Sequence, residues 1–170
     1  KVYGQDNNLK TDYKGTIAFA SSDIRSILPS DYTFSASDQG SKDFYITYKT
    51  TGIQTFSVTD WNAKITLKSA ETKVEAGSSV SISITPEDSE TSPGSTTKFT
   101  VLSKDKYENK VDVTKDSKWS IDKEAGGSWN LNVYTAGNEG VWTVMASYNS
   151  LTDGTTLVVE KGVTPTPTPT

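Results

Sequence analysis

The sequence predicts an all-β protein in which two β-sandwich units follow one another, the first lacking N-terminal strands, before an extended Thr-Pro tail. Three observations support this fold class. Short segments alternate apolar and polar residues and are separated by clusters of Gly, Asp, Asn, Ser and Pro. Ser and Thr are abundant throughout, which favours strands and turns over helices. Finally, similar phrases recur in the two halves of the chain.

The clearest strands are expected at 141–148 and 155–160. In the first, Trp142, Val144, Ala146 and Tyr148 fall on one face by period-2 alternation. The connection 149–154, NSLTDG, is rich in turn formers, so the two segments form a predicted hairpin. The other expected strands are 16–21, 32–36, 42–50, 54–60, 63–69, 79–85, 97–104, 118–122 and 129–136.

A faint internal repeat sets the predicted domain organisation. The run 52–58 parallels 140–146, and 2–12 parallels 106–116. This places a first domain at 1–77, a second at 78–161 and a linker at 162–170. The segment 81–101 has no counterpart in the first repeat, which is therefore shorter by about 20 residues, the length of a few strands. Either this is a boundary of the fragment, which reads as part of a mature chain, or a neighbouring chain supplies the strand.

The tail TPTPTPT at 164–170 is predicted to be an extended polyproline-type linker without core-forming residues. Alternating Thr and Pro is also a plausible substrate for O-glycosylation, and the candidate acceptors are Thr164, Thr166, Thr168 and Thr170. A plain spacer without sugars is the alternative interpretation.

Composition excludes several classes of function. The chain has no Cys and no His, which removes disulfides, zinc-thiolate sites, thiol catalysis and the usual general base. The net charge is −4, so no basic stripe is available for a nucleic-acid partner. No apolar run approaches membrane-spanning length, and membrane insertion is not expected.

Several phrases carry a resemblance to a known family. The segments 84–101, 105–114, 121–129 and 140–160, together with 11–23, 28–40 and 51–60, resemble the bacterial and archaeal Ig-like (Big-type) repeats of large surface proteins. The resemblance covers nearly the whole chain outside the tail and implies two tandem Ig-like sandwiches at an extracellular location. It is poor evidence for function, because members of that family serve as spacers, stalks, adhesin segments and accessory modules of secreted enzymes.

Local turn chemistry agrees with this topology. In YENK, at 107–110, Asn109 is expected to adopt positive φ in a hairpin turn. The glycines of EAGG, at 124–127, suit a tight reversal before Trp129.

Catalysis is not expected, because the carboxylates fall in Ser/Thr-rich turns and no motif places two acids across a pocket. Sugar binding is a weaker alternative to a structural role, with Trp61, Trp129 and Tyr134 as the candidate stacking residues. Strand positions favour a core role for tryptophans such as Trp129, whereas Trp61 lies at a strand end and is the aromatic most expected to be exposed. Calcium binding by the oxygen-rich loop containing Asp38 and Asp43 competes with a simple Asp turn.

The sequence thus predicts a non-catalytic extracellular structural or adhesive module, a stalk or surface-layer building block. Its expected partners are neighbouring Ig-like domains or copies of itself, and possible partners include a polysaccharide. One alternative is a carbohydrate-binding accessory module of a secreted enzyme. Another is a filament subunit completed by strand exchange, for which an open groove is expected in residues 1 to 75.

Overall fold

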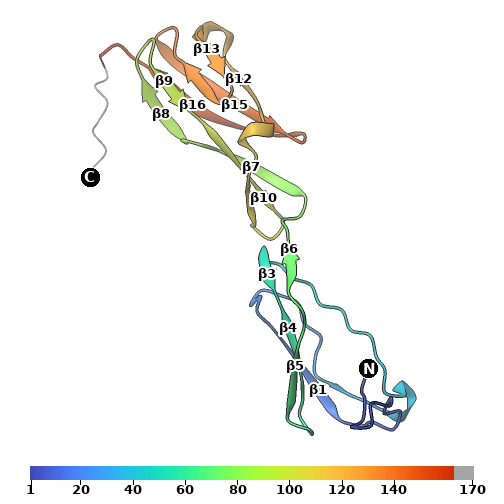
Figure 1. The fold of residues 1–170 in the computed structure, drawn as a ribbon. Helices are drawn as coiled ribbons and strands as arrows, with labels where there is room; N and C mark the ends of the chain where they lie inside the picture. The colour runs from blue at the N-terminus through green and yellow to red at the C-terminus, as the bar shows by residue number, and fades with distance from the viewer. Residues whose placement is uncertain (163–170) are drawn as a thin grey trace, which may run out of the picture. The chain divides into compact units, whose positions relative to one another are not determined.

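The fold is all-β, as predicted. The computed structural model describes residues 1–162, and these divide into two compact units, of which unit 1 spans Lys1–Glu75 and unit 2 begins at Ala76 (Figure 1). No α-helix occurs within residues 1–162, and helical backbone is limited to three short 3₁₀ turns, η1 (Ala36–Asp38), η2 (Thr114–Asp116) and η3 (Lys123–Ala125).

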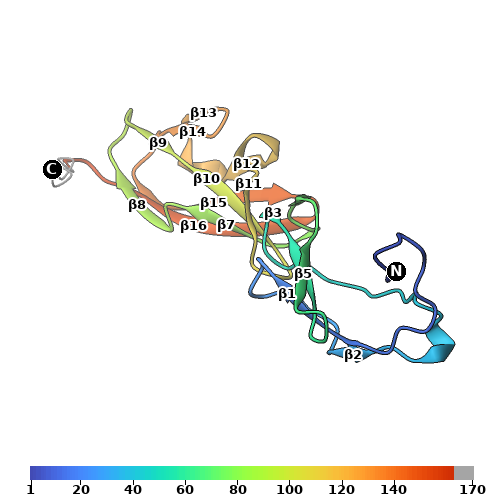
Figure 2. The same cartoon turned by 60° about the horizontal axis from the view of Figure 1, so that its bottom comes forward.

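Unit 1 contains one four-stranded antiparallel sheet in the order β2-β1-β4-β5, so β2 is an edge strand beside β1 (Figure 2). The pair β3 and β6 adds a short two-stranded sheet. The strands are β1 (Thr16–Ser21), β2 (Tyr32–Thr33), β3 (Gly52–Gln54), β4 (Phe56–Asp60), β5 (Ile65–Lys68) and β6 (Thr72–Val74). Strand β5 has one partner, β4, so its other edge is unpaired within residues 1–75.

Unit 2 is a fuller sandwich. Its sheets have the orders β12-β15-β16-β8, β11-β10-β7 and β13-β14-β9. Strand β8 pairs with β16 in parallel, and β7 pairs with β10 in antiparallel fashion. The strands are β7 (Ser79–Thr85), β8 (Asp88–Thr91), β9 (Thr96–Lys98), β10 (Thr100–Asp105), β11 (Lys110–Asp112), β12 (Lys118–Ile121), β13 (Ser128–Asn130), β14 (Val133–Thr135), β15 (Gly140–Tyr148) and β16 (Leu151–Val159).

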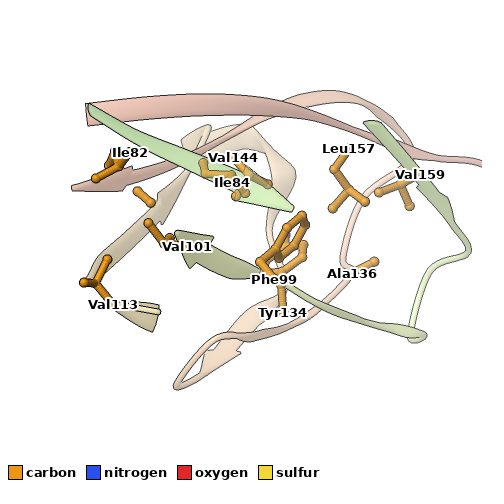
Figure 3. Close-up of a cluster of buried hydrophobic side chains, with 11 residues drawn as sticks. Ile82, Ile84, Phe99, Val101, Val113, Tyr134, Ala136, Val144, Leu157 and Val159 are labelled. Atoms are coloured by element: carbon orange, nitrogen blue, oxygen red, sulfur yellow. The ribbon is translucent and has the colours of Figure 1, made fainter. Parts of the chain in front are cut away.

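The core of unit 2 is closed by side chains from opposed strands (Figure 3). Phe99, Val101 and Leu157 are fully buried, and Trp119 and Trp129 stack against the cluster with ring centroids 5.6 Å apart. Burying one aliphatic side chain such as Val101 or Leu157 contributes roughly 1.5–3 kcal/mol to the stability of the fold. The remaining members of the cluster are Ile82, Ile84, Val113, Tyr134, Ala136, Val144, Ala146 and Val159.

The β15–β16 hairpin confirms the predicted alternation but not the predicted turn. Val144 and Ala146 are buried while Thr143 and Met145 are exposed. The turn is only Asn149–Ser150, and both residues have positive φ, as a two-residue type I′ turn requires. Strand β16 therefore begins at Leu151 and includes Gly154, which the sequence had placed in the connection.

Three other local expectations were wrong. Residues 42–50 form no strand and make a single bridge, Ile27 with Thr47; Figure 1 draws them as an irregular segment leading to β3. The expected strand 129–136 is instead the hairpin β13–β14, which turns at Leu131 with φ of 55°. In the 107–110 turn the positive φ belongs to Glu108 rather than Asn109, because the buried Asn109 amide is held by Asp105.

One cause accounts for the missing strand at 42–50. In unit 2, β14 has partners on both edges, β13 and β9. Within residues 1–75 the 42–50 segment pairs with no strand and makes only the bridge between Thr47 and Ile27. The strand propensity of residues 42–50 is therefore not enough to form a β ladder, because a ladder also requires a neighbouring strand.

Candidate functional site: an open apolar cavity in unit 1

Unit 1 contains an open cavity of about 600 Å³. Its floor is the inner face of the main sheet, where Phe19 of β1, Val58 of β4 and Leu67 of β5 lie in neighbouring strands. Residues near the N-terminus and the 42–46 segment form its sides. The other apolar lining residues are Val2, Tyr3, Tyr13, Ile17, Phe34, Phe44, Ile46, Phe56 and Ile65.

Aromatic packing holds one wall of the cavity together. Phe44 packs on Phe19 with centroids 4.8 Å apart and on Tyr32 at 5.3 Å. Tyr13 meets Phe34 edge to face at 5.3 Å. Edge-to-face pairs of this kind add about 0.5–1.5 kcal/mol to the burial of the rings. The 42–46 segment, which lacks a β ladder, is therefore held to the sheet through Phe44.

The inner face of unit 1 is less covered than the matching face of unit 2. The repeat aligns Phe56 and Val58 of β4 with Val144 and Ala146 of β15. The two residues of unit 2 are fully buried, whereas those of unit 1 are half-buried. Within residues 1–75 the buried hydrophobic side chains are Ile17 and Phe34, which are 8% and 4% exposed. In unit 2, strands β7 and β10 supply side chains that cover this face, and no strand within residues 1–75 takes that position.

Strand β5 forms an exposed rim of the cavity. Leu67 is 70% exposed, Ile65 is also exposed, and both line the cavity. The Ser69 N–H donates to the Phe56 carbonyl at 2.8 Å. Because hydrogen-bonding residues alternate along an antiparallel strand, the N–H groups of Thr66 and Lys68 point to the unpaired edge. The rim therefore offers both apolar side chains and free backbone donors.

A polar pair lies at one end of the cavity. The Tyr13 hydroxyl donates to Asp60 Oδ2 at 2.6 Å, and Asp60 Oδ1 accepts the N–H groups of Asn62 and Ala63 at 2.8 and 2.9 Å. Burial, together with the carboxylate partner, raises the pKa of Tyr13 to about 12. Burial also acts to raise the pKa of Asp60, but these hydrogen bonds outweigh it and lower the pKa. Asp60 is therefore an ionised turn-stabilising group, not a proton donor.

Each unit holds one buried carboxylate with an organising role. Asp23 accepts the backbone N–H groups of Arg25, Lys49 and Thr50 and the Thr50 hydroxyl. Burial by itself raises its pKa, yet these donors prevail and lower the pKa to about 2. In unit 2, the Asp105 carboxylate accepts the backbone N–H groups of Gly77, Tyr107 and Asn109. Its pKa is likewise lowered to about 2 by these donors, although burial raises it. Both carboxylates are committed to backbone donors, which is a structural use.

The three candidate sugar-stacking residues are not brought together. Trp61 belongs to unit 1 and is 60% exposed, while its backbone N–H donates to Thr16. Trp129 and Tyr134 belong to unit 2 and pair across β13 and β14 with centroids 5.0 Å apart. Tyr134 is 1% exposed and donates its hydroxyl to the Gly126 carbonyl, so it is a core residue and its ring has no face open to a sugar. Trp129 is half-buried against the same core.

The candidate calcium residues sit in a turn. Asp38 accepts the Ser35 N–H at 2.8 Å and the Tyr32 hydroxyl at 2.9 Å, and Lys42 lies 3.8 Å away. Asp43 is exposed on the cavity rim. No group of three or more acidic, His or Cys side chains suited to a metal ion occurs within residues 1–162. Calcium binding by these two residues stays a prediction.

The proposed glycosylation acceptors Thr164, Thr166, Thr168 and Thr170 lie outside the described residues. In the part of the chain that the structure describes, no helix has the length and apolar character needed to cross a membrane.

Reasoning from the sequence missed the individual residues of the cavity. Phe19 and Phe44 were expected only as strand residues, although they form a wall of the cavity together. The available signal was the repeat comparison, which showed that the first unit has no counterpart of residues 81–101. An open groove in residues 1 to 75 was expected only for the alternative of a filament subunit completed by strand exchange, and that expectation did not name the side chains that line it.

Comparisons with known proteins complete the description. No protein-family model matches the chain, and no curated protein sequence matches it. Among solved structures, the chain is similar to the S-layer protein rSbsC(31-844), with 17% identity and a TM-score of 0.43 over 95% of this chain and 22% of that one. It is also similar to SbsC domains 4 and 5, with 18% identity and a TM-score of 0.40 over 93% of this chain and 78% of that one.

A third similar structure is that of SbsC domains 1-6, with 18% identity and a TM-score of 0.34, over 92% of this chain and 22% of that one. The chain thus spans about a fifth of the length of the longer S-layer chains. Because every TM-score is below 0.5 and every identity below 25%, these similarities assign no function to the chain.

Proposed function

We propose that the chain is a non-catalytic structural module of a cell-surface or secreted protein, built from two β-sandwich units in series. The observation that carries the proposal is the repetition of one strand plan. Strand β1 pairs with β4 and β4 with β5 in unit 1, and β12 pairs with β15 and β15 with β16 in unit 2. A strand plan used twice in one chain is the organisation expected of a serial building block.

The use of polar groups supports the same proposal. The buried carboxylates Asp23 and Asp105 bind backbone N–H groups, and Asp60 closes a turn. Each group is satisfied by its own unit and stabilises a connection between strands, which is the role of a scaffold residue. Catalytic carboxylates require a different arrangement, with one acid held near neutrality beside a cleft. An extracellular location rests on the resemblance to surface repeats and on the Thr-Pro tail.

A force measurement tests the structural role. When the full chain is stretched between its ends, a serial module unfolds in two discrete events. At about 3.3–3.6 Å per residue, the extended chain is roughly 250–270 Å long for unit 1 and roughly 290–310 Å for the described part of unit 2. Unit 1 is expected to yield first because its core is open on one side. A single gradual extension without discrete events would contradict the proposal.

Location and ligand binding require separate assays. Protease treatment of intact source cells is expected to release fragments of this chain, since a surface module is accessible from outside. Titration with soluble polysaccharides tests the carbohydrate-binding alternative, with Trp61→Ala as the diagnostic variant because Trp61 is the exposed tryptophan. Saturable binding that this substitution abolishes would overturn the structural proposal in favour of a sugar-binding module.

A further inference from the structure

The turn between β13 and β14 places a leucine where hairpin geometry favours glycine. Asn130 pairs with Val133, so the loop consists of two residues, Leu131 and Asn132. Leu131 has a φ of 55°, whereas the φ of Asn132 is not positive. A two-residue hairpin loop with positive φ at its first position alone is a type II′ turn, in which that position is normally occupied by glycine.

Nothing in unit 2 compensates for the strain at Leu131. The left-handed backbone brings the Cβ of an ordinary residue too close to a carbonyl oxygen, and burial of the side chain could offset that cost. Leu131, however, is 85% exposed. It is also the one apolar residue among the non-glycine residues with positive φ within residues 1–162, the others being Asn7, Gln39, Lys64, Glu108, Asn149 and Ser150.

The core holds this turn in place. The Asn132 side-chain amide donates to the Phe99 carbonyl, and the Phe99 N–H donates to the Asn132 carbonyl at 2.9 Å. Phe99 is fully buried, so the turn is anchored to the centre of unit 2. Leu131 is therefore presented to solvent in a fixed position, and an apolar side chain that is already ordered loses little entropy when it binds. Strain of this kind, kept without an internal gain, points to a function outside the unit.

The surface next to the turn is apolar and faces outward. Strand β14 lies between β13 and β9 (Figure 2), and its register places Val133 beside Lys98. Both side chains face outward, because the next residue along each strand is buried in the core. Leu102 of β10 faces outward for the same reason and pairs with Asp112 of β11. We call Leu131, Val133 and Leu102, with the charges of Lys98 and Asp112, the Leu131 face.

The Leu131 face carries one exposed charge of each sign. Neither Lys98 nor Asp112 belongs to an ion pair within residues 1–162. In a two-fold contact each residue meets its counterpart reciprocally, so opposite charges on one face complement each other across the axis. The other charged side chains of β10, β11 and η2 that reach the surface are Lys104, Lys110, Lys115 and Asp116, and Lys104 is paired with Glu108. The region is therefore not acidic, although the whole chain carries a net charge of −4.

We infer that Leu131 is a docking residue and that the Leu131 face binds a second copy of this chain across a two-fold axis. Each Leu131 packs on Val133 and Leu102 of the other copy, and Lys98 of each copy lies beside Asp112 of the other. A protein surface is favoured over a lipid surface, because a single leucine among charges of both signs gives little affinity for a bilayer. The inference rests on the proposed function, because it gives a structural module a contact with its neighbour.

The test measures self-association of the full chain by analytical ultracentrifugation up to about 1 mM, because a contact of this small size is weak. Reversible dimers are expected. Leu131→Gly should weaken dimerisation at least about tenfold, since it removes the docking side chain. The same substitution should raise the urea midpoint of unit 2, because glycine adopts positive φ without strain. Stability and dimerisation therefore change in opposite directions, which a loss of folding cannot produce.

Matched controls separate docking from general surface effects. Val141→Ser removes an apolar side chain that is 67% exposed elsewhere on unit 2, and it should leave dimerisation unchanged. Lys98→Glu should weaken dimerisation several-fold at low salt and less at high salt. Adding Asp112→Lys to Lys98→Glu restores opposite charges across the axis and should recover most of that loss. Circular dichroism of each variant checks that the sheets are retained.

Each result has a defined consequence. A chain that stays monomeric at about 1 mM overturns the inference, as does dimerisation that Leu131→Gly leaves unchanged while the urea midpoint rises. Binding to phosphatidylcholine vesicles that depends on Leu131, without dimers, would make a lipid surface the occupant and would also overturn it. Two discrete unfolding events under force would still support the proposed function in a monomeric chain, so the two failures are distinguishable.

Discussion

Replacing Asp105 by Asn should destabilise unit 2 by an amount that depends on pH. Asp105 is 3% exposed, and its carboxylate accepts four hydrogen bonds. The donors are the N–H groups of Gly77, Tyr107 and Asn109 and the Asn109 side-chain amide, at 2.7–3.0 Å. Asn keeps the size of the side chain but removes the charge, and its NH₂ group faces donors that need an acceptor.

The magnitude follows from the pKa of Asp105. Burial raises that pKa, but the four hydrogen-bond donors outweigh burial, and the net effect lowers the pKa from 3.8 to about 2. Each unit of difference from the unfolded value is worth about 1.4 kcal/mol, so ionised Asp105 stabilises the fold by about 2 kcal/mol at neutral pH. Because the folded pKa is depressed, this stabilisation is present above pH 4 and is lost as the pH falls towards 2.

The assay is urea unfolding followed by tryptophan fluorescence at pH 7, 4, 3 and 2. Trp61→Phe in both proteins confines the signal to unit 2, which holds the other three tryptophans. Asp105→Asn should lower the free energy of unfolding by about 2 kcal/mol at pH 7, and the difference should shrink between pH 4 and 2. The control is Asp116→Asn, which makes the same charge change at an exposed position.

Two results would refute this reasoning. One is a loss at pH 7 of less than about 0.5 kcal/mol, within the range of ordinary surface substitutions. The other is a loss of the expected size that stays constant from pH 7 to pH 2, which would show that ionisation of Asp105 is not its source.

Three further predictions concern the two units. Leu157→Ala should lower the free energy of unfolding by about 3 kcal/mol, because Leu157 is fully buried. Leu67→Ala should lower it by under about 1 kcal/mol in the chain by itself, because Leu67 is exposed; urea unfolding measures both values. Gly127→Ala should lower Tm much more than Gly94→Ala: both glycines have positive φ, but only at Gly127 would the added Cβ overlap the Thr135 carbonyl oxygen. Asp23→Asn should destabilise unit 1 above pH 4 and have a diminishing effect towards pH 2, as monitored by Trp61 fluorescence, since hydrogen bonds lower the Asp23 pKa to about 2 despite its burial.

The sequence predicted most strands but not every pairing. Alternation correctly placed β15, yet it put the following turn across 149–154, because Asp153 and Gly154 are common turn residues. Only pairing with Met145 and Ala146 shows that both belong to β16. The 42–50 segment alternates as a strand should, but it forms none: within residues 1–75 it pairs with no strand and makes only the bridge between Ile27 and Thr47.

The candidate site could be predicted only in outline. An open groove in residues 1 to 75 was expected only for the filament alternative, and the cavity lies in that part of the chain. The aromatic wall could not be read from the sequence, because Phe19 and Phe44 are far apart in the chain and meet only after folding. Tyr134 was a candidate ligand contact by residue type, yet its position opposite Trp129 in the core makes it a packing residue.

The sequence by itself determined the all-β class, the two-fold repetition of strand segments and the side chains that share a face of each strand. These properties are local, because alternation and turn chemistry act within a few residues. Only the tertiary structure decided which faces are covered. Val144 and Phe56 occupy equivalent positions in the two units. Val144 is covered by side chains of β7 and β10, whereas Phe56 lines a cavity. Burial depends on strands distant in the chain, and no local pattern records whether such a strand is present.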